Sequence, residues 1–237
     1  MFKIALTAGH YRYTAGKRCL KKLDANETRE WVLNARIAEK IESILKDYDG
    51  YSLLRTDDPS GEKEITMEQR VAAANKFGAD IYISLHHNAG IYGGKGGGIV
   101  AYVYKNCSEK AKEWQKDLYE SLIKHTSLKG NRATPLATSN LYECRATKMP
   151  AVLLELGFMD SATDVPVILS EEYASSAAKA IVEVIVKKAG LRKKIVEQPK
   201  TLYRVQVGAF TVKKNAENLV NELKAKGYSA IIKEETK

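Results

Sequence analysis

The sequence predicts an α/β fold in which helices flank a mostly parallel sheet, followed by a small strand-helix-strand unit at 202–237. Over residues 1–190, short β-type runs alternate with longer segments of helical periodicity, as in layered α/β folds. Two runs, at 81–85 and 151–156, are almost continuously apolar, which is typical of strands covered on both faces. Residues 191–201 are charged and contain a proline, so we expect a linker there.

Periodicity and capping residues predict the first elements. An apolar run at 3–8 is expected to be a strand, and 51–55 is expected to be a second one. Residues 24–27 (Asp-Ala-Asn-Glu) have the residue types of a capping box, which predicts that a helix begins there. A second capping box at 66–69 predicts a helix that ends at Gly78, because glycine accepts the left-handed conformation that follows many helices.

The second half of the first domain is expected to contain three strands and two long helices. The strands are predicted at 81–85, 99–104 and 151–156, and the helices at 108–128 and 171–188, before a glycine at 190. In the terminal unit, strands at 203–207 and 228–233 are expected to flank a helix at 216–226.

Composition excludes several classes of protein. Hydrophobic residues make up 44% and charged residues 28% of the 237, which argues against disordered and fibrous classes. No apolar run approaches the length of a membrane-spanning helix, and the N-terminus lacks an apolar stretch of signal-peptide length, so we expect cytoplasmic synthesis without a signal peptide. Cys19, Cys107 and Cys144 have scattered spacing and are predicted to be reduced thiols.

The net charge of +9 is concentrated at the C-terminus. Residues 191–237 carry 11 Lys and Arg against 5 Asp and Glu, a net charge of +6. Such a bias favours a polyanionic partner. Nucleic acid, anionic membrane and cell-wall polymer all remain open on charge alone.

Four polar residues are predicted to meet at one edge of the sheet. His10 follows the first strand, and His86 and Glu155 lie at the ends of two others, while Glu30 lies near the start of the first helix. Ligands of open α/β sheets bind outside the carboxyl ends of the strands. Two imidazoles and one carboxylate form the ligand set of a catalytic zinc site, which leaves a second carboxylate to act as a base.

Other roles for these residue types compete with that hypothesis. A single histidine at a strand end is more often a structural hydrogen-bonding group, so the hypothesis depends on all four residues converging. His87 points to the opposite side of its strand from His86 and is interpreted as a cleft residue. His125, late in a helix, is expected to interact with the helix dipole. Glu27 competes with Glu30 as a ligand.

Four segments resemble the signature segments of the zinc-dependent N-acetylmuramoyl-L-alanine amidase family. They are Gly9-His10, 29–34 (Arg-Glu-Trp-Val-Leu-Asn), 84–89 (Ser-Leu-His-His-Asn-Ala) and 154–158 (Leu-Glu-Leu-Gly-Phe). The likeness covers about residues 1–188. It implies hydrolysis of the amide between N-acetylmuramic acid and L-alanine of peptidoglycan. A different zinc peptidase, acting on the stem peptide, is the competing hypothesis.

The resemblance implies one zinc ion per chain. It assigns zinc ligation to His10, Glu30 and His86, and catalysis to Glu155. The spacing from Glu30 to an asparagine four residues later matches the family pattern, which favours Glu30 over Glu27.

Substrate contacts are less well defined by the resemblance. The candidates are His87, Asn88 and Arg70, and a structural role competes for Arg70. Residues 11–13 (Tyr-Arg-Tyr) depart from the Gly-Gly-x-Asp stretch of many relatives, which affects this part of the cleft. The family and the missing signal segment together imply a phage endolysin, or an enzyme that lyses a sporulating mother cell, acting on the wall after release.

The tail resembles the first half of a sporulation-related repeat (SPOR) domain, a family that binds peptidoglycan glycan strands. Residues 203–210 carry the likeness, and the candidate wall-binding residues are Tyr203, Gln206 and Phe210. A packing arm or a dimerisation strand is the alternative, because exposed strand edges pair between chains. Stacking of nucleic-acid bases on the two aromatic rings is a further alternative, although no nucleic-acid partner is expected.

Overall fold

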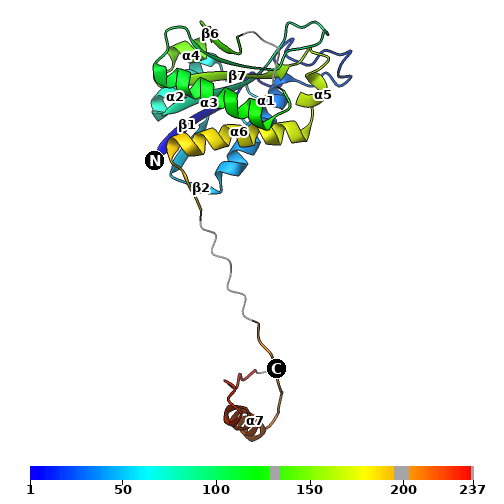
Figure 1. Ribbon diagram of the computed structural model, residues 1–237, viewed down its shortest axis with the longest axis vertical. Coiled ribbons are helices and arrows are strands. Elements are labelled where there is room, and N and C mark those ends of the chain that lie inside the picture. The colour runs from blue at the N-terminus through cyan, green and yellow to red at the C-terminus, as the bar shows by residue number, and fades with distance from the viewer. Residues whose placement is uncertain (129–133, 195–202, 236–237) are drawn as a thin grey trace. The chain divides into compact units, whose positions relative to one another are not determined.

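This computed structural model describes residues 1–128, 134–194 and 203–235, in two compact units, Met1–Lys194 and Ile195–Lys237 (Figure 1). The first unit extends four residues past the expected boundary at 190. The reason is that Leu191 is buried and β8 (Arg192–Lys193) pairs with β2 (Tyr48–Asp49). The rest of the expected linker, 195–201, lies outside the described residues.

The first unit contains a six-stranded sheet in the order β3-β1-β4-β7-β5-β6. Its strands are β1 (Phe2–Ala8), β3 (Tyr51–Arg55), β4 (Ile81–Asn88), β5 (Ile99–Tyr104), β6 (Leu136–Ser139) and β7 (Ala151–Phe158). Every neighbouring pair is parallel except β5 and β7. Strands β5 and β6 run opposite to the other four, and no crossover helix lies between β4 and β5. The predicted α/β class is confirmed, whereas β6 was not expected.

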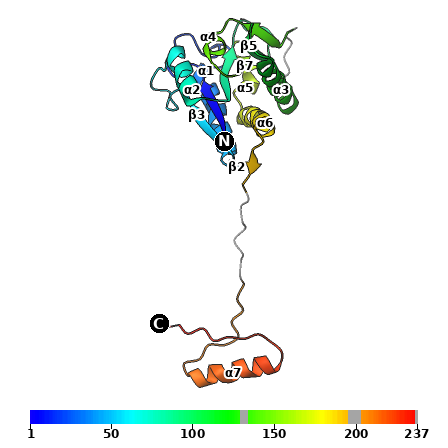
Figure 2. The same ribbon diagram turned by 90° about the vertical axis from the view of Figure 1, so that its left-hand side faces the viewer.

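Helices cover both faces of this sheet. They are α1 (Glu30–Leu45), α2 (Met67–Phe77), α3 (Glu109–His125), α4 (Tyr142–Ala146), α5 (Val165–Ile168) and α6 (Glu171–Ala189). Helix α6 packs against both α1 and α3 on one face, and Figure 2 shows α3 and α6 side by side. Helices α2 and α4 pack together on the other face.

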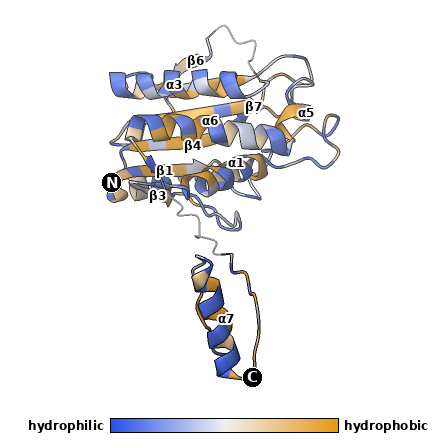
Figure 3. Cartoon of the chain, turned by 60° about the horizontal axis from the view of Figure 1, so that its bottom comes forward, coloured by the Kyte–Doolittle hydropathy of each residue, from blue (hydrophilic) through white to orange (hydrophobic). Residues whose placement is uncertain are grey.

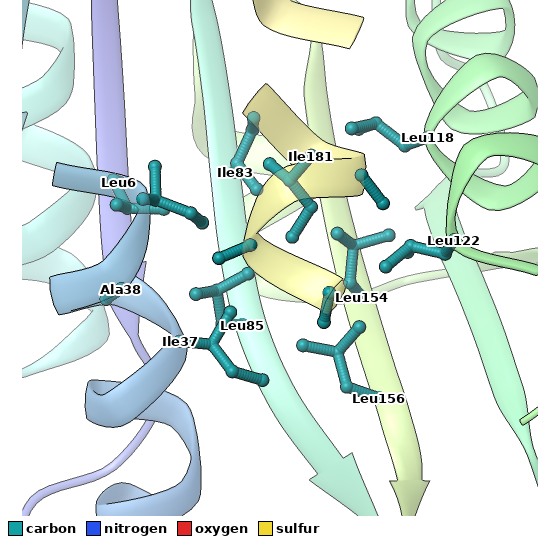
Figure 4. Packing of buried hydrophobic residues seen from close by; sticks show 14 of the residues in the cluster. Leu6, Ile37, Ala38, Ile83, Leu85, Leu118, Leu122, Leu154, Leu156 and Ile181 are labelled. Carbon is teal, nitrogen blue, oxygen red and sulfur yellow. The ribbon is translucent and has the colours of Figure 1, made fainter. Parts of the chain in front are cut away.

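The larger core lies between the sheet and the face formed by α1, α3 and α6 (Figure 4). Alternate residues of the central strands enter it, such as Ile83 and Leu85 of β4. The residues between them, including Tyr82, face α2 and α4. Figure 3 shows that hydrophobic residues dominate β4 and β7, as expected of strands buried on both faces.

The first helix begins later than the sequence predicts. The side chain of Asp24 accepts hydrogen bonds from the backbone N–H groups of Asn26 (3.1 Å) and Thr28 (2.7 Å) and so closes a local turn, and α1 starts at Glu30. The predicted capping box at 24–27 is therefore wrong. The one at Thr66 is present and Gly78 ends α2 with φ +67°, both as predicted.

In the second unit, the described residues contain the helix α7 (Lys213–Ala225) and no strand. The strands predicted at 203–207 and 228–233 are therefore absent from this part of the chain. A strand requires a hydrogen-bonded partner, and here the apolar side chains lie in solvent instead, with Tyr203 87% and Ile231 88% exposed. None of the helices in the described ranges has the length and apolarity needed to span a bilayer.

Candidate active site

The four predicted site residues meet at the carboxyl edge of the sheet. His10 follows β1, His86 lies near the end of β4, and Glu155 lies beside His86 in register on β7. Glu30 is the first residue of α1, which follows the loop after β1. Together with Lys17, three of these residues line a cleft of about 310 Å³.

His10, Glu30 and His86 form a compact group with one possible metal-ligand atom each, all within 4.8 Å of one another. Glu30 Oε2 lies 3.3 Å from His10 Nε2, and Glu30 Oε1 lies 3.1 Å from His86 Nδ1. The Glu30 side chain is 1% exposed, and its Oε2 atom has no hydrogen-bond partner among the described residues. A buried, unsatisfied carboxylate oxygen between two imidazoles fits a divalent metal such as zinc.

The protonation of this group depends on its charged neighbours. Burial alone raises the pKa of Glu30, but the neighbouring rings of His10 and His86 lower it well below its usual range. Burial alone lowers the pKa of His86, but the carboxylates of Glu143 and Glu30 beside its ring raise it to about 10. The two carboxylates therefore favour the protonated ring, so a metal would compete with a proton for a ring nitrogen of His86.

Gly9 makes room for the ring of His86. A Cβ atom on Gly9 would lie 2.1 Å from Cε1 of His86, far inside van der Waals contact. The next residue, His10, has a φ of +68°, a conformation that residues other than glycine rarely adopt. The close approach explains why a glycine precedes the histidine at the end of β1, and the strained backbone of His10 is a feature of the same site.

We expect Gly9→Ala to abolish metal binding, because the added methyl group displaces the His86 ring from the cluster. Metal content after purification, with circular dichroism to confirm folding, measures the effect. Gly16→Ala is the control, because a Cβ atom on Gly16 meets no atom within 4 Å, while its φ of +72° adds a backbone cost that Gly9→Ala does not have. Equal metal content in the two variants would contradict the expectation.

Glu155 faces the same cleft without a hydrogen-bond partner for its Oε2 atom among the described residues. Burial raises the pKa of Glu155 to about 7; the Glu30 charge adds to this, while His86 and Lys17 oppose it. A carboxyl group with a pKa near neutrality is suited to accept and return a proton.

Two of the predicted substrate contacts, His87 and Asn88, lie at the cleft. His87 and Asn88 line the cleft, although His87 is 2% exposed and its Nδ1 lies 2.8 Å from Oδ1 of Asn34. Burial lowers the pKa of His87 to about 3, so its ring is neutral. A substrate contact by His87 or Asn88 stays a prediction.

Arg70 forms several hydrogen bonds within the protein. Its guanidinium is buried and donates to Oγ1 of Thr7 (3.0 Å) and to the backbone carbonyls of Ala8 (3.0 Å), His10 (2.6 Å) and Ile65 (2.8 Å). These bonds fix the end of β1 beside the site. This contact pattern supports the structural role that the sequence left open for Arg70, and a substrate contact by Arg70 stays a prediction.

The two glutamates that compete as metal ligands, Glu27 and Glu30, have different partners in the structure. Glu27 forms an ion pair with Arg18 at 3.1 Å, whereas Glu30 joins the histidine cluster. Lys17, whose Nζ lies 3.7 Å from Glu30 Oε2, was missed because it lies in a loop without periodicity. Glu143, 3.6 Å from Nε2 of His86, was missed because its helix has only five residues.

The candidate wall-binding residues lie in the second unit, before α7. Tyr203 is 87% exposed and Phe210 is 48% exposed, and the ring of Phe210 lies against Gly208. Gln206 donates a hydrogen bond to the carbonyl of Gly208 at 3.4 Å. Their role in binding stays a prediction.

Comparison with known families decides the relationship of the chain. Residues 4–187 match the Amidase_3 family, described as N-acetylmuramoyl-L-alanine amidase. The chain belongs to the N-acetylmuramoyl-L-alanine amidase family. Residues 175–237 of this amidase also match the SPOR domain, a match that begins within α6. The two resemblances drawn from the sequence motifs are thus confirmed.

Individual relatives agree with this assignment. A sporulation-specific N-acetylmuramoyl-L-alanine amidase of Bacillus subtilis (strain 168) is 30% identical over 235 residues, which cover 98% of this amidase and 84% of the relative. The endolysin of Bacillus phage SPP1 is 29% identical over 189 residues, which cover 80% of this amidase and 66% of the endolysin.

Solved structures share the fold of the first unit. The catalytic domain of CwlV, an N-acetylmuramoyl-L-alanine amidase from Bacillus (Paenibacillus) polymyxa var. colistinus, superimposes with a TM-score of 0.71 at 23% identity. The match covers 81% of this amidase and 100% of that domain. The chain is therefore a peptidoglycan amidase with a SPOR region at its C-terminus.

Proposed function

We propose that this amidase is a zinc hydrolase that cleaves the amide between the lactyl group of N-acetylmuramic acid and the L-alanine of the stem peptide. The supporting observation is the group of His10, Glu30 and His86 at the carboxyl edge of the sheet, with Glu155 in register beside His86. This arrangement provides three metal ligands and a separate carboxylate that faces the same cleft.

Each residue has a defined part in the reaction. His10, Glu30 and His86 would hold the zinc ion, which would supply Lewis-acid activation of water and of the scissile carbonyl. Glu155 accepts a proton from the attacking water and returns it to the departing amine of L-alanine. The products are the carboxylate of the lactyl group and a stem peptide with a free amino terminus.

Digestion of purified cell walls, with and without a zinc chelator, tests this proposal. We expect lysis that the chelator abolishes and added zinc restores, and new amino termini that are all alanine. A new terminus at another stem-peptide residue would show a peptidase instead. If metal analysis shows that the chelator has removed the zinc and lysis is unchanged, a role for zinc is excluded.

We propose that the second unit adds affinity for the cell wall and takes no part in the chemistry. The four site residues all lie in the first unit, while the SPOR match extends through the second. Because β8 belongs to the first unit, residues 195–237 retain 8 Lys and Arg against 5 Asp and Glu, a net charge of +3. Because this charge is small, the exposed aromatic and apolar side chains contribute to the affinity for the wall as well.

We expect a protein that ends at Lys194 to keep its zinc and to cleave small soluble muropeptides at the full-length rate. It should sediment less with intact walls, and salt should weaken its wall binding less than that of the full-length chain. Sedimentation and muropeptide assays measure these effects. If both proteins bind walls equally but differ in oligomeric state, the unit is a dimerisation arm instead.

A further inference from the structure

A buried carboxylate outside the proposed ligand group contacts His86 from the opposite side. Glu143 lies on α4, is 3% exposed, and brings its Oε2 atom to 3.6 Å from Nε2 of His86. Its Oε1 atom accepts a hydrogen bond from the hydroxyl of Tyr82, and Oε2 accepts one from the hydroxyl of Ser84 at 3.2 Å. Two side chains of β4 therefore hold the carboxylate against the ring of a third.

The ring of His86 lies between two carboxylates. Its Nδ1 atom faces Glu30 at 3.1 Å, within the proposed metal group, while its Nε2 atom faces Glu143. A ring nitrogen that binds a metal carries no proton, so the ring proton must then lie on Nε2. Among the described residues, Glu143 has the carboxylate that lies within 4.0 Å of Nε2 of His86.

We infer that Glu143 is a positioning residue that fixes the orientation and tautomer of His86 for metal binding; this inference rests on the proposed zinc site. Donation from Nε2–H to a carboxylate makes the other ring nitrogen a better ligand. The carboxylate can act in this way because Tyr82 and Ser84 restrict its position. Removal of such a partner lowers metal affinity by about 10- to 100-fold.

A purely structural role predicts a different result. Glu143 also satisfies the buried hydroxyl groups of Tyr82 and Ser84, so its replacement could affect folding alone. A structural residue affects the stability of the metal-free protein, whereas a positioning residue affects its affinity for zinc. The two quantities can be measured separately.

Glu143→Gln is the main variant, because glutamine keeps the shape but removes the negative charge and one of the two acceptor oxygens. Zinc affinity is measured by competition with a chromophoric chelator, and the metal-free protein is unfolded thermally. We expect zinc binding about 10- to 100-fold weaker than in the wild type, with a smaller rise in Tm on zinc addition. Long-range ¹H–¹⁵N NMR of the zinc form should show the proton on Nε2 of His86 in the wild type and an altered Nε2 signal in the variant.

Cys144→Ala is the matched control, because Cys144 is the next residue of α4 and is also buried. This variant shows how far a packing change in α4 alone affects zinc affinity. It should leave zinc affinity unchanged. If Glu143→Gln does not fold, Tyr82→Phe is the second variant, because it removes one of the two hydrogen bonds that restrict the Glu143 carboxylate and leaves His86 unchanged. A several-fold loss of zinc affinity in Tyr82→Phe then supports the inference, and unchanged affinity overturns it.

Two outcomes overturn the inference in the folded variant. The first is a wild-type zinc affinity in Glu143→Gln, and the second is an equal loss of affinity in Cys144→Ala. Failure of the proposed zinc function is distinct from both, because the wild-type protein would then bind no zinc. If the wild-type protein binds zinc and Glu143→Gln binds it equally well, only the role of Glu143 is rejected and the zinc site stands.

Discussion

Replacement of Glu155 with glutamine should lower the turnover of wall fragments by about 10²- to 10⁴-fold while zinc remains bound. Glutamine preserves the size of the side chain but cannot accept the proton of the attacking water. The carboxylate lies outside the group of His10, Glu30 and His86, so its loss should not remove a ligand. Single-turnover kinetics on a soluble muropeptide, with metal analysis of the same sample, measure both quantities.

The pH profile provides a second readout of the same residue. Because burial raises the pKa of Glu155 to about 7, activity should fall as the pH falls below about 7 and the base becomes protonated. A bound dication opposes this shift, so the midpoint in the zinc enzyme should lie at or below that value. The residual activity of Glu155→Gln should lack this acid limb.

Glu27→Gln is the control for both measurements, because Glu27 pairs with Arg18 away from the cluster. It should retain turnover and the acid limb. Near-normal turnover in Glu155→Gln would remove this residue from the mechanism. Loss of zinc in that variant would instead make Glu155 a ligand and require Glu30 to be reassigned.

His86→Ala should abolish both zinc binding and wall lysis. The ring provides Nδ1 to the metal group and forms contacts with the carboxylates of Glu30 and Glu143, so the variant leaves two buried carboxylates without their shared partner. Such groups are costly when unpaired, and the metal-free variant should therefore also unfold at a lower temperature. Metal analysis, turbidity of a wall suspension and thermal unfolding measure the three effects.

His125→Ala is the matched histidine variant. His125 lies on α3 and pairs with Glu183 of α6 at 2.9 Å, outside the cleft. It should keep both zinc and lytic activity. Unchanged zinc content in His86→Ala would show that the metal, if bound, is held elsewhere, and the ligand assignment would be wrong.

The fold of the first unit followed from local patterns because its strands and helices are long and periodic. The strand at β4 was expected from its continuous apolar run, and the helix at α2 from a capping box at Thr66 and a glycine at Gly78. The capping box expected at Asp24 was wrong because the same residue types also close turns in loops. Local residue types do not distinguish these two uses.

The terminal unit was predicted less well. The alternating residues at 203–207 have strand periodicity, but the described residues provide no partner strand. Pairing depends on another segment, so periodicity alone cannot establish it. The boundary at Lys194 depended in the same way on the pairing of β8 with β2.

The sequence by itself determined that His10, His86 and Glu155 share one edge of the sheet, because each follows or ends a strand and the carboxyl ends of parallel strands lie together. Only the tertiary structure placed Glu30 rather than Glu27 beside the two histidines, and only it placed Glu143 against His86. The physical reason is that a residue's place along a strand or helix follows from local periodicity. A contact between α4 and β4, 57 residues apart in the chain, depends on how the two elements pack.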